Sequence, residues 1–150
     1  MTMKKRLRYL VLHGPNLNLL GTREPDVYGR VTLDDINKSL KRLADELAID
    51  VDCHQSNHEG TLLDLMQGAA GVVDGCVINA GAYTHTSIAL HDCIKAMPYP
   101  VVEVHLSNIH AREAFRHVSR LGPAVRASIA GLGWRSYTAA LRALVEQVRE

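Results

Sequence analysis

Strong charge of either sign is missing from this sequence, since 17 Lys and Arg residues balance 16 Asp and Glu residues and leave a net charge of +1. We therefore expect that the protein does not bind a nucleic acid or a membrane through its overall charge. Long hydrophobic runs are also missing, because no segment approaches the ~18 apolar residues of a membrane helix. The basic opening MTMKKRLRYLVLH has only a short apolar run and no A-x-A cleavage site, so we interpret residues 1–6 as a polar tail.

Cysteine is equally scarce. The chain has three cysteines, Cys53, Cys76 and Cys93, so they cannot all be paired in disulfides within one chain, and no two of them form a C-x-x-C motif. Buried reduced thiols are the simpler interpretation, and they suit a cytoplasmic protein. The histidines form no H-E-x-x-H, and the end of a predicted strand separates His54 from His58. The sequence therefore predicts neither a structural nor a catalytic metal.

Apolar residues are plentiful, at 47% of 150, which is enough for one folded domain over residues 1–150. Short aliphatic runs typical of buried parallel strands occur at 7–13, 49–54, 75–79, 100–105 and about 125–130. Helical patterns alternate with them at 33–48, 60–70, 86–96, about 111–118 and from Tyr137 to Val148, and Thr32 and Asp35 form a plausible capping pair for the first. This alternation predicts the α/β class, as a flavodoxin-like, five-stranded parallel sheet of order 2-1-3-4-5 with helices on both faces.

The predicted topology also predicts where a ligand binds, because open α/β sheets bind ligands beyond the carboxyl ends of their strands. Polar residues that are far apart in sequence converge on that edge. They are Asn16, Arg23 and Tyr28 after the first strand, Asn79 and His85 after the third, and His105, Ser107, Arg112 and Arg116 at or after the fourth.

Several of these residues also have a simpler interpretation. Asn79 could be a turn-capping amide, His85 a surface or near-cap residue, and His105 a satisfied half-buried histidine. Glu103 favours a functional role for His105, because residues two apart on a strand share a face and a buried carboxylate supports an imidazolium.

Arg112 and Arg116 are four residues apart in the predicted 111–118 helix and would therefore share a face. Alone they would be a solvated surface. At the strand ends they suit an anionic ligand, because guanidinium groups bind carboxylates and phosphates in bidentate fashion.

The segment GPNLNLLGTREPDVYG, residues 14–29, is long for a connection without an apolar period, and such connections are usually functional. It contains neither a phosphate-binding G-x-x-x-x-G-K-[ST] nor a G-x-G-x-x-G, and the chain has no G-x-S-x-G. Instead it resembles the signature of type II 3-dehydroquinate dehydratases. Later family segments are resembled in the same order by QSNHEG (55–60), INAGAYTHTS (78–87), EVHLSNIHAREAFRH (103–117) and GLGWRSYTAAL (131–141).

Four residues depart from that family pattern. Arg120, Ala127, Ser128 and Ser136 stand where an aromatic, a glycine, an aliphatic residue and a glycine are expected. These departures put the packing of the fifth strand or a subunit contact in question, but not the catalytic residues.

The resemblance implies a hydro-lyase that converts 3-dehydroquinate to 3-dehydroshikimate, in the shikimate pathway or in quinate catabolism, without a cofactor. It implies that Tyr28 is the base, assisted by the neighbouring cation of Arg23, and that an enolate is stabilised through a water near Asn16. His105 would then be the acid that protonates the departing hydroxyl, with Glu103 orienting it. The loop with Arg23 and Tyr28 would close as a lid over the substrate.

The resemblance also implies substrate-binding positions and an assembly. Residues at the matching positions for substrate hydroxyl and carboxylate groups are Asn79, His85, Leu106, Ser107, Arg116 and, in a supporting position, Arg112. The family forms trimers that assemble into dodecamers, and Asp92 matches a position that reaches a neighbouring subunit's site. The residues alone would make Asp92 a solvated charge.

One other route to this dehydration uses a lysine imine as electron sink. The five lysines are Lys4, Lys5, Lys38, Lys41 and Lys95, and none occupies a loop predicted to build the site. The sequence therefore favours an enolate without a covalent intermediate. A different class of function remains open on the same fold, namely a non-catalytic, oligomeric binder of small anions. Such a protein would need Arg112 and Arg116 but not the pair Tyr28 and Arg23.

Overall fold

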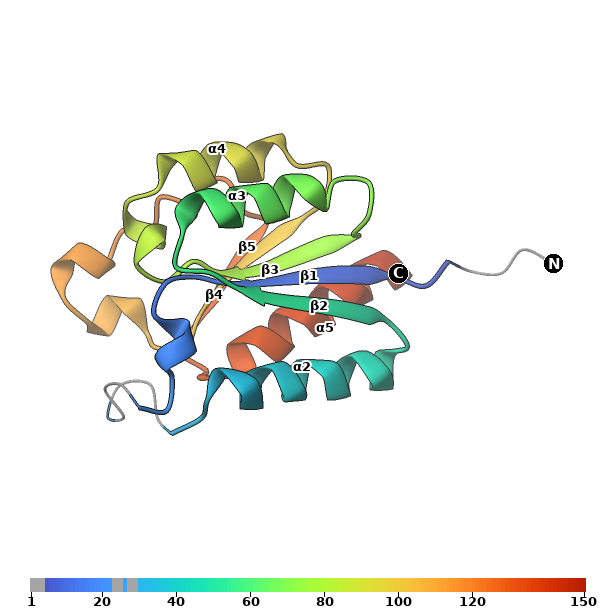
Figure 1. Ribbon diagram of the computed structural model, residues 1–150, viewed down its shortest axis with the longest axis horizontal. Helices are drawn as coiled ribbons and strands as arrows, with labels where there is room; N and C mark the ends of the chain where they lie inside the picture. The colour runs from blue at the N-terminus through green and yellow to red at the C-terminus, as the bar shows by residue number, and fades with distance from the viewer. Residues whose placement is uncertain (1–4, 23–25, 27–29) are drawn as a thin grey trace.

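The computed structural model of the protein describes residues 5–22, 26 and 30–150. Among these residues, five strands form one parallel sheet in the order β2-β1-β3-β4-β5 (Figure 1). The strands are β1 (Arg8–His13), β2 (Asp50–Gln55), β3 (Gly75–Asn79), β4 (Val101–His105) and β5 (Ala127–Ala130). The predicted fold class and strand order are confirmed.

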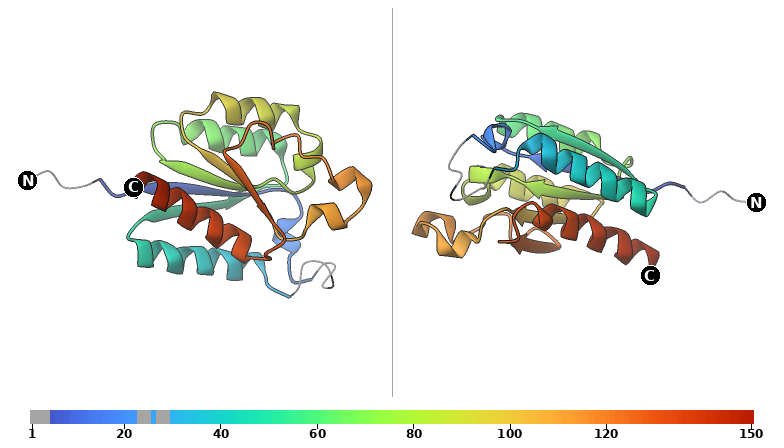
Figure 2. Two further views of the ribbon diagram at one scale, coloured as in Figure 1. Left: turned by 180° about the vertical axis from the view of Figure 1, so that it is seen from behind. Right: turned by 90° about the horizontal axis from the view of Figure 1, so that it is seen from below.

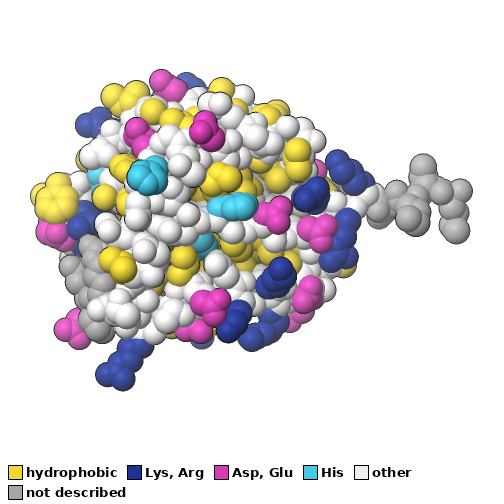
Figure 3. Space-filling model, in the orientation of Figure 1, with side chains coloured by type: hydrophobic (Ala, Val, Ile, Leu, Met, Phe, Trp, Pro, Cys, Tyr) yellow, Lys and Arg dark blue, Asp and Glu magenta, His cyan; other side chains and the backbone are white. Residues whose placement is uncertain are grey.

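Helices cover both faces of the sheet. One face carries α2 (Leu33–Leu47) and α5 (Arg135–Arg149), and the other carries α3 (Glu59–Gly68) and α4 (Ile88–Ala96) (Figures 1 and 2). No helix among the described residues is both long and apolar enough to span a membrane. On the face shown in Figure 3, basic and acidic side chains are interspersed rather than gathered into a patch of one sign.

The two cores follow from the alternation of side chains along the central strands. Tyr9 and Val11 of β1 pack with residues of α2 and α5, whereas Leu10 and Leu12 pack with residues of α3 and α4. Strands β1, β3 and β4 are buried almost throughout because helices cover both of their faces. The sheet therefore holds the carboxyl ends of its central strands at fixed positions.

The start of α2 shows how the sequence sets a local boundary. The Thr32 side chain accepts the backbone N–H of Asp35 at 3.1 Å, and the Asp35 carboxylate accepts the backbone N–H of Thr32 at 3.0 Å. This reciprocal capping box satisfies two N–H groups that would otherwise lack partners in the helix, so the predicted capping pair is confirmed.

The predicted helix at 111–118 is wrong. Two short 3-10 turns, η3 (Ile109–Ala111) and η4 (Ala114–Arg116), occupy the region, and Arg112 between them is extended, with φ −105° and ψ −166°. A continuous helix would need an apolar stripe against the core. Phe115 and Val118 instead are 66% and 60% exposed, so nothing in the described chain stabilises a longer helix here.

A histidine is buried at the end of β1, on the face that carries α2 and α5. His13 is fully buried, its Nε2 lies 2.8 Å from the amide oxygen of Asn37, and its Nδ1 lies 2.9 Å from the hydroxyl of Tyr137. Burial lowers the pKa of His13 from 6.5 to about 4 despite the hydrogen bond to Asn37, which favours the charged form. The ring is therefore neutral near neutral pH.

We expect this histidine to make the fold sensitive to mild acid. As the pH falls below ~6.5, the His13 imidazole becomes protonated in the unfolded chain, whereas in the folded chain it remains neutral until about pH 4. Its contribution to stability is therefore complete above that range and is lost as the pH falls through it, by roughly 3 kcal/mol in all. Urea denaturation at about pH 7 and about pH 5 measures the loss. In a His13→Gln variant this part of the pH dependence should disappear, and an unchanged pH dependence would contradict the assignment.

Candidate active site

A pocket opens at the carboxyl edge of the sheet, beyond β1, β3 and β4. Side chains or backbone from the three following loops line it together, as the topology predicted. Eight of the residues predicted for the site line this pocket, namely Asn16, Asn79, His85, His105, Leu106, Ser107, Arg112 and Arg116. Arg23 and Tyr28 lie outside the described residues.

The loops after β1 and β3 contact each other directly. The backbone N–H of Gly14 donates to the carbonyl of Asn79 at 2.7 Å, and a side chain at Gly14 would stand 2.4 Å from the carbonyl oxygen of Ala80. A glycine is therefore required where these two loops meet. Asn16 follows in a left-handed conformation, with φ +70°, and its backbone N–H donates to the Asn57 side chain at 3.0 Å. The close approach brings Asn16 and Asn79 into one pocket.

Asn79 ends β3 almost completely buried, at 4% exposure. Its side-chain oxygen accepts the backbone N–H of Gly81 at 3.1 Å. The simpler interpretation, a turn-capping amide, and the functional one, a pocket residue, therefore both describe this side chain.

Glu103 and His105 form a buried pair at the end of β4, exposed by 1% and 6%. His105 Nε2 lies 2.8 Å from one carboxylate oxygen of Glu103. Because a carboxylate only accepts, this nitrogen carries a proton and leaves Nδ1 for the pocket, on whose wall His105 lies. Glu103 itself lies behind the histidine, as the strand period of two predicted.

Two serines complete the surroundings of the carboxylate. Ser119 donates to the same oxygen as His105 at 2.7 Å, and Ser128 donates to the other oxygen at 3.0 Å. Burial opposes ionisation, but the hydrogen bonds from His105, Ser119 and Ser128 and the charge of His105 hold the pKa of Glu103 below its usual value. The carboxylate is therefore charged at neutral pH although it is buried.

Ser119 was missed by the sequence analysis, because nothing in its spacing from Glu103 points to a contact. Ser128 is one of the four departures from the family pattern, and its spacing from Glu103 in the sequence predicts no contact either. The structure instead pairs β5 with β4 along its whole length, with Ser128 opposite Glu103. Ser136 is fully buried, and its hydroxyl accepts the N–H of Leu132 at 3.2 Å. Both hydroxyls thus have partners, and β5 pairs with β4 although it carries Ala127 and Ser128.

Arg112 and Arg116 line the pocket, but not from one helix face. Arg112 is the extended residue that follows η3, Arg116 ends η4, and Glu113 lies between them in sequence. Arg116 Nε is 3.2 Å from the Glu113 carboxylate and Arg112 Nε is 3.8 Å from it. The side chains are only 19% and 15% exposed, so most of each guanidinium stem is packed while the pocket remains cationic. The predicted shared helix face is therefore wrong, although both arginines line the pocket beyond the strand ends, as the topology predicts.

His85 ends the 3-10 turn η2 (Gly81–His85), and its Nδ1 lies 2.8 Å from the carbonyl of Val118. A carbonyl only accepts, so Nδ1 carries the proton and Nε2 is the nitrogen that can accept from a ligand. The segment with the arginines therefore also sets the tautomer of this histidine.

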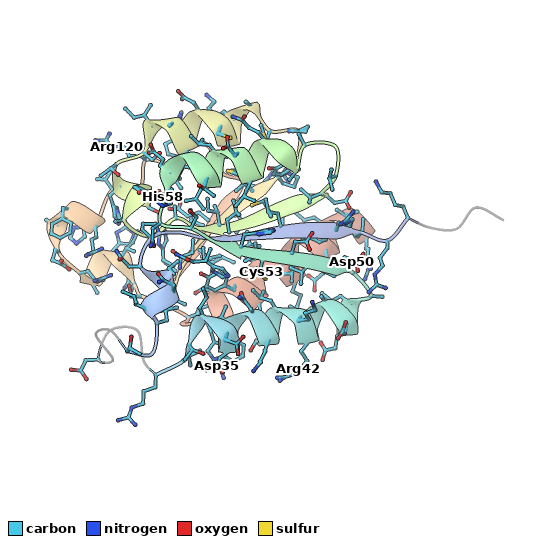
Figure 4. The ribbon with its side chains drawn as sticks, in the orientation of Figure 1. Asp35, Arg42, Asp50, Cys53, His58 and Arg120 are labelled. Carbon is cyan, nitrogen blue, oxygen red and sulfur yellow. The ribbon has the colours of Figure 1, made fainter. Side chains whose placement is uncertain are left out.

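Asp92 lies elsewhere, on α4. It borders a surface hollow with Ile88, Val118 and Arg120 rather than the pocket, and its carboxylate is 2.9 Å from His91 Nδ1. Figure 4 shows Arg120 at the outer surface near the same helix. Within this chain, Asp92 is a largely exposed charge.

The thiols and histidines outside the pocket have structural settings. Cys53 and Cys76 lie in β2 and β3, and all three cysteines are free. His54 lies in β2 while His58 is the N-cap of α3, where Figure 4 shows it. The part of the chain that the structure describes contains no cluster of three His, Cys, Asp or Glu residues that could hold a metal ion.

Comparison with known proteins gives a consistent result. A sequence family described as "Dehydroquinase class II" matches residues 7–145. Proteins named 3-dehydroquinate dehydratase are similar to this chain, one from Geotalea daltonii at 54% identity over 96% of this chain and 100% of that protein. Another, from Ruegeria pomeroyi, is 58% identical over 90% of this chain and 91% of that protein. A crystal structure of a type II dehydroquinase from Butyrivibrio crossotus superposes with a TM-score of 0.91 and 40% identity, over 93% of this chain and 97% of that one.

Proposed function

Since the chain belongs to the class II dehydroquinases and is a 3-dehydroquinate dehydratase of type II, we propose that the pocket at the carboxyl edge of the sheet carries out this reaction through an enolate and without a cofactor. One observation supports the site above all others. The imidazole of a buried, hydrogen-bonded carboxylate–imidazole pair lines the same pocket as two arginines, so that proton transfer and anion binding are available together.

We assign the first step, removal of the proton next to the ketone, to Tyr28. A phenol with a pKa of ~10 needs a nearby cation to act near neutral pH, and Arg23 of the same loop supplies it. Both residues lie outside the described part of the chain, so their roles rest on the family resemblance. The negative charge moves to the ketone oxygen, where a water held near Asn16 stabilises it by hydrogen bonding.

In the second step the adjacent carbon loses its hydroxyl group, and His105 supplies the proton that lets it leave as water. The geometry supports this role, because Glu103 holds the opposite ring nitrogen and stabilises the imidazolium. The electron pair of the enolate forms the new carbon–carbon double bond. No group is oxidised or reduced, so the reaction needs no redox cofactor.

Substrate binding uses the remaining groups of the pocket. Arg116, with Arg112 in support, suits the carboxylate of dehydroquinate, and Asn79, His85 and the backbone of Leu106 and Ser107 suit its hydroxyl groups. No lysine is among the described residues that line the pocket, which favours the enolate over an imine. A non-catalytic anion binder would need the arginines but gains nothing from the buried Glu103–His105 pair.

Substitution of Tyr28 and of His105 tests the two proposed proton-transfer steps. Tyr28→Phe should retain the fold and much of the substrate affinity but lower kcat by about 10²–10⁴-fold, because it removes the general base. His105→Ala should also lower kcat, because it removes the acid. The conjugated enone product absorbs in the ultraviolet, so the rate is read directly from purified protein with dehydroquinate.

The matched control is His110→Ala, which removes an exposed histidine close by in sequence. We expect its kcat to equal that of the wild type. A Tyr28→Phe enzyme with near wild-type kcat would exclude the base assignment, and a His105→Ala enzyme altered only in KM would exclude the acid assignment. Absence of enone from the wild-type protein would favour the anion binder.

We also propose that the chain forms trimers that assemble into a dodecamer in the cytoplasm. An apolar surface supports an assembly, since Ile88, Phe115 and Val118 are 60–66% exposed and β5 is a largely exposed edge strand. Ile88 and Val118 border the same hollow as Asp92, and this proximity supports the proposal that Asp92 contributes to a neighbouring subunit's site.

Val118→Asp should therefore break the assembly and lower activity, because a charge would be buried between subunits. Val148→Asp is the control, since Val148 is an exposed valine, at 53%, in the last turn of α5. Light scattering should give about 200 kDa for the wild type, twelve times the 16.5 kDa chain, and a smaller mass only for Val118→Asp. An active wild-type monomer would contradict this proposal.

A further inference from the structure

A chain of buried polar side chains runs behind the pocket, from α2 through β1 and α5 to β3. It consists of Asn37, His13, Tyr137 and Asn79. His13 and Tyr137 are fully buried, and Asn79 is 4% exposed. Burying polar groups costs free energy unless each has a partner, so a chain of this kind beside the core between the sheet and α2 and α5 is not needed to fill space.

The direction of each hydrogen bond in this chain follows from its pocket end. The Gly81 backbone N–H can only donate, so the atom of Asn79 that it contacts at 3.1 Å is the amide oxygen. The amide nitrogen of Asn79 is then the group that donates to the hydroxyl oxygen of Tyr137, with which the Asn79 side chain is hydrogen-bonded. Both ends of the Asn79 amide are thereby fixed.

The remaining bonds follow in the same direction. The Tyr137 hydroxyl oxygen accepts a hydrogen bond from Asn79, and its own O–H therefore donates a hydrogen bond to His13 Nδ1, at 2.9 Å. His13 then carries its proton on Nε2 and donates it to the amide oxygen of Asn37, at 2.8 Å. Only one arrangement of protons satisfies every member of the chain.

Neither ring in the chain changes charge near neutral pH. Burial lowers the pKa of His13 to about 4, and burial raises the pKa of Tyr137. The single proton arrangement therefore persists through the pH range in which a cytoplasmic enzyme works.

We infer that Tyr137 and His13 are positioning residues for the dehydration, which hold the Asn79 amide so that its second N–H and the second lone pair of its oxygen face the substrate. Neither residue lines the pocket, so both act through Asn79. This inference rests on the proposed role of Asn79 in substrate binding. It explains why a histidine and a tyrosine 124 residues apart meet behind the site.

The test compares two buried tyrosines in the same core. Tyr137→Phe removes the hydroxyl that holds Asn79, whereas Tyr9→Phe removes a hydroxyl that has no hydrogen-bond partner among the described residues. Tyr9 is likewise buried, at 1% exposure. We expect Tyr137→Phe to raise KM about tenfold with a much smaller change in kcat, as for the loss of one hydrogen bond used throughout the reaction. Tyr9→Phe should leave both constants unchanged.

Combination with Asn79→Ala separates positioning from a general structural effect. If Tyr137 acts through Asn79, the double variant should have the KM of Asn79→Ala alone, because the amide to be positioned is already gone. Multiplicative effects in the double variant, or an unchanged KM in Tyr137→Phe, would overturn the inference. An unchanged KM in Asn79→Ala would overturn it together with the assignment of Asn79.

If the Tyr137→Phe protein does not fold, a second variant tests the same inference. Asn37→Leu removes the amide oxygen that accepts from His13, at a partly exposed position, and should also raise KM. In an Asn79→Ala background it should have no further effect on KM. An Asn37→Leu enzyme with wild-type KM would overturn the inference. Wild-type protein without any turnover would instead count against the proposed function, so the two failures are distinguishable.

Discussion

The site depends on one interaction, the contact between the buried carboxylate of Glu103 and the imidazole of His105. A charge in the interior of a sheet is costly, and breaking such a pair by removing one partner typically costs 3–5 kcal/mol. Here the carboxylate remains ionised because three donors from separate parts of the chain converge on it, namely His105, Ser119 and Ser128. Ser128 lies on the neighbouring strand β5, and Ser119 lies in the segment between β4 and β5. The fold of this region therefore keeps ionised the Glu103 carboxylate that the proposed acid requires.

The same arrangement explains how distant residues form one pocket. The segment from η3 to Ser119 supplies the two arginines, the carbonyl that sets the His85 tautomer and one donor to Glu103. On the other side of the pocket, the contact of Gly14 with Asn79 joins the loops after β1 and β3. Proton transfer, anion binding and amide positioning therefore share one rigid edge of the sheet, as expected for a site that must hold its groups before the substrate arrives.

Much of this could be predicted from the sequence, for identifiable reasons. Alternating β and α patterns determine a parallel sheet, and the strand period of two places Glu103 beside His105. The helix predicted at 111–118 is absent because Phe115 and Val118 are exposed, so the segment has no apolar stripe to bury against the core. The contacts of Ser119 with Glu103 and of Tyr137 with His13 depend on how separate elements pack, and no local pattern in a single sequence encodes such distances.

The charge of Glu103 is proposed to stabilise the protonated His105 that expels the hydroxyl. The decisive measurement is the pH dependence of kcat for dehydroquinate in the wild type and in Glu103→Gln, with folding checked by circular dichroism. We predict that the variant folds, loses at least about tenfold in kcat near neutral pH, and loses its remaining activity at a lower pH than the wild type as the pH rises. A folded Glu103→Gln enzyme with the wild-type kcat and the wild-type pH dependence would contradict the account.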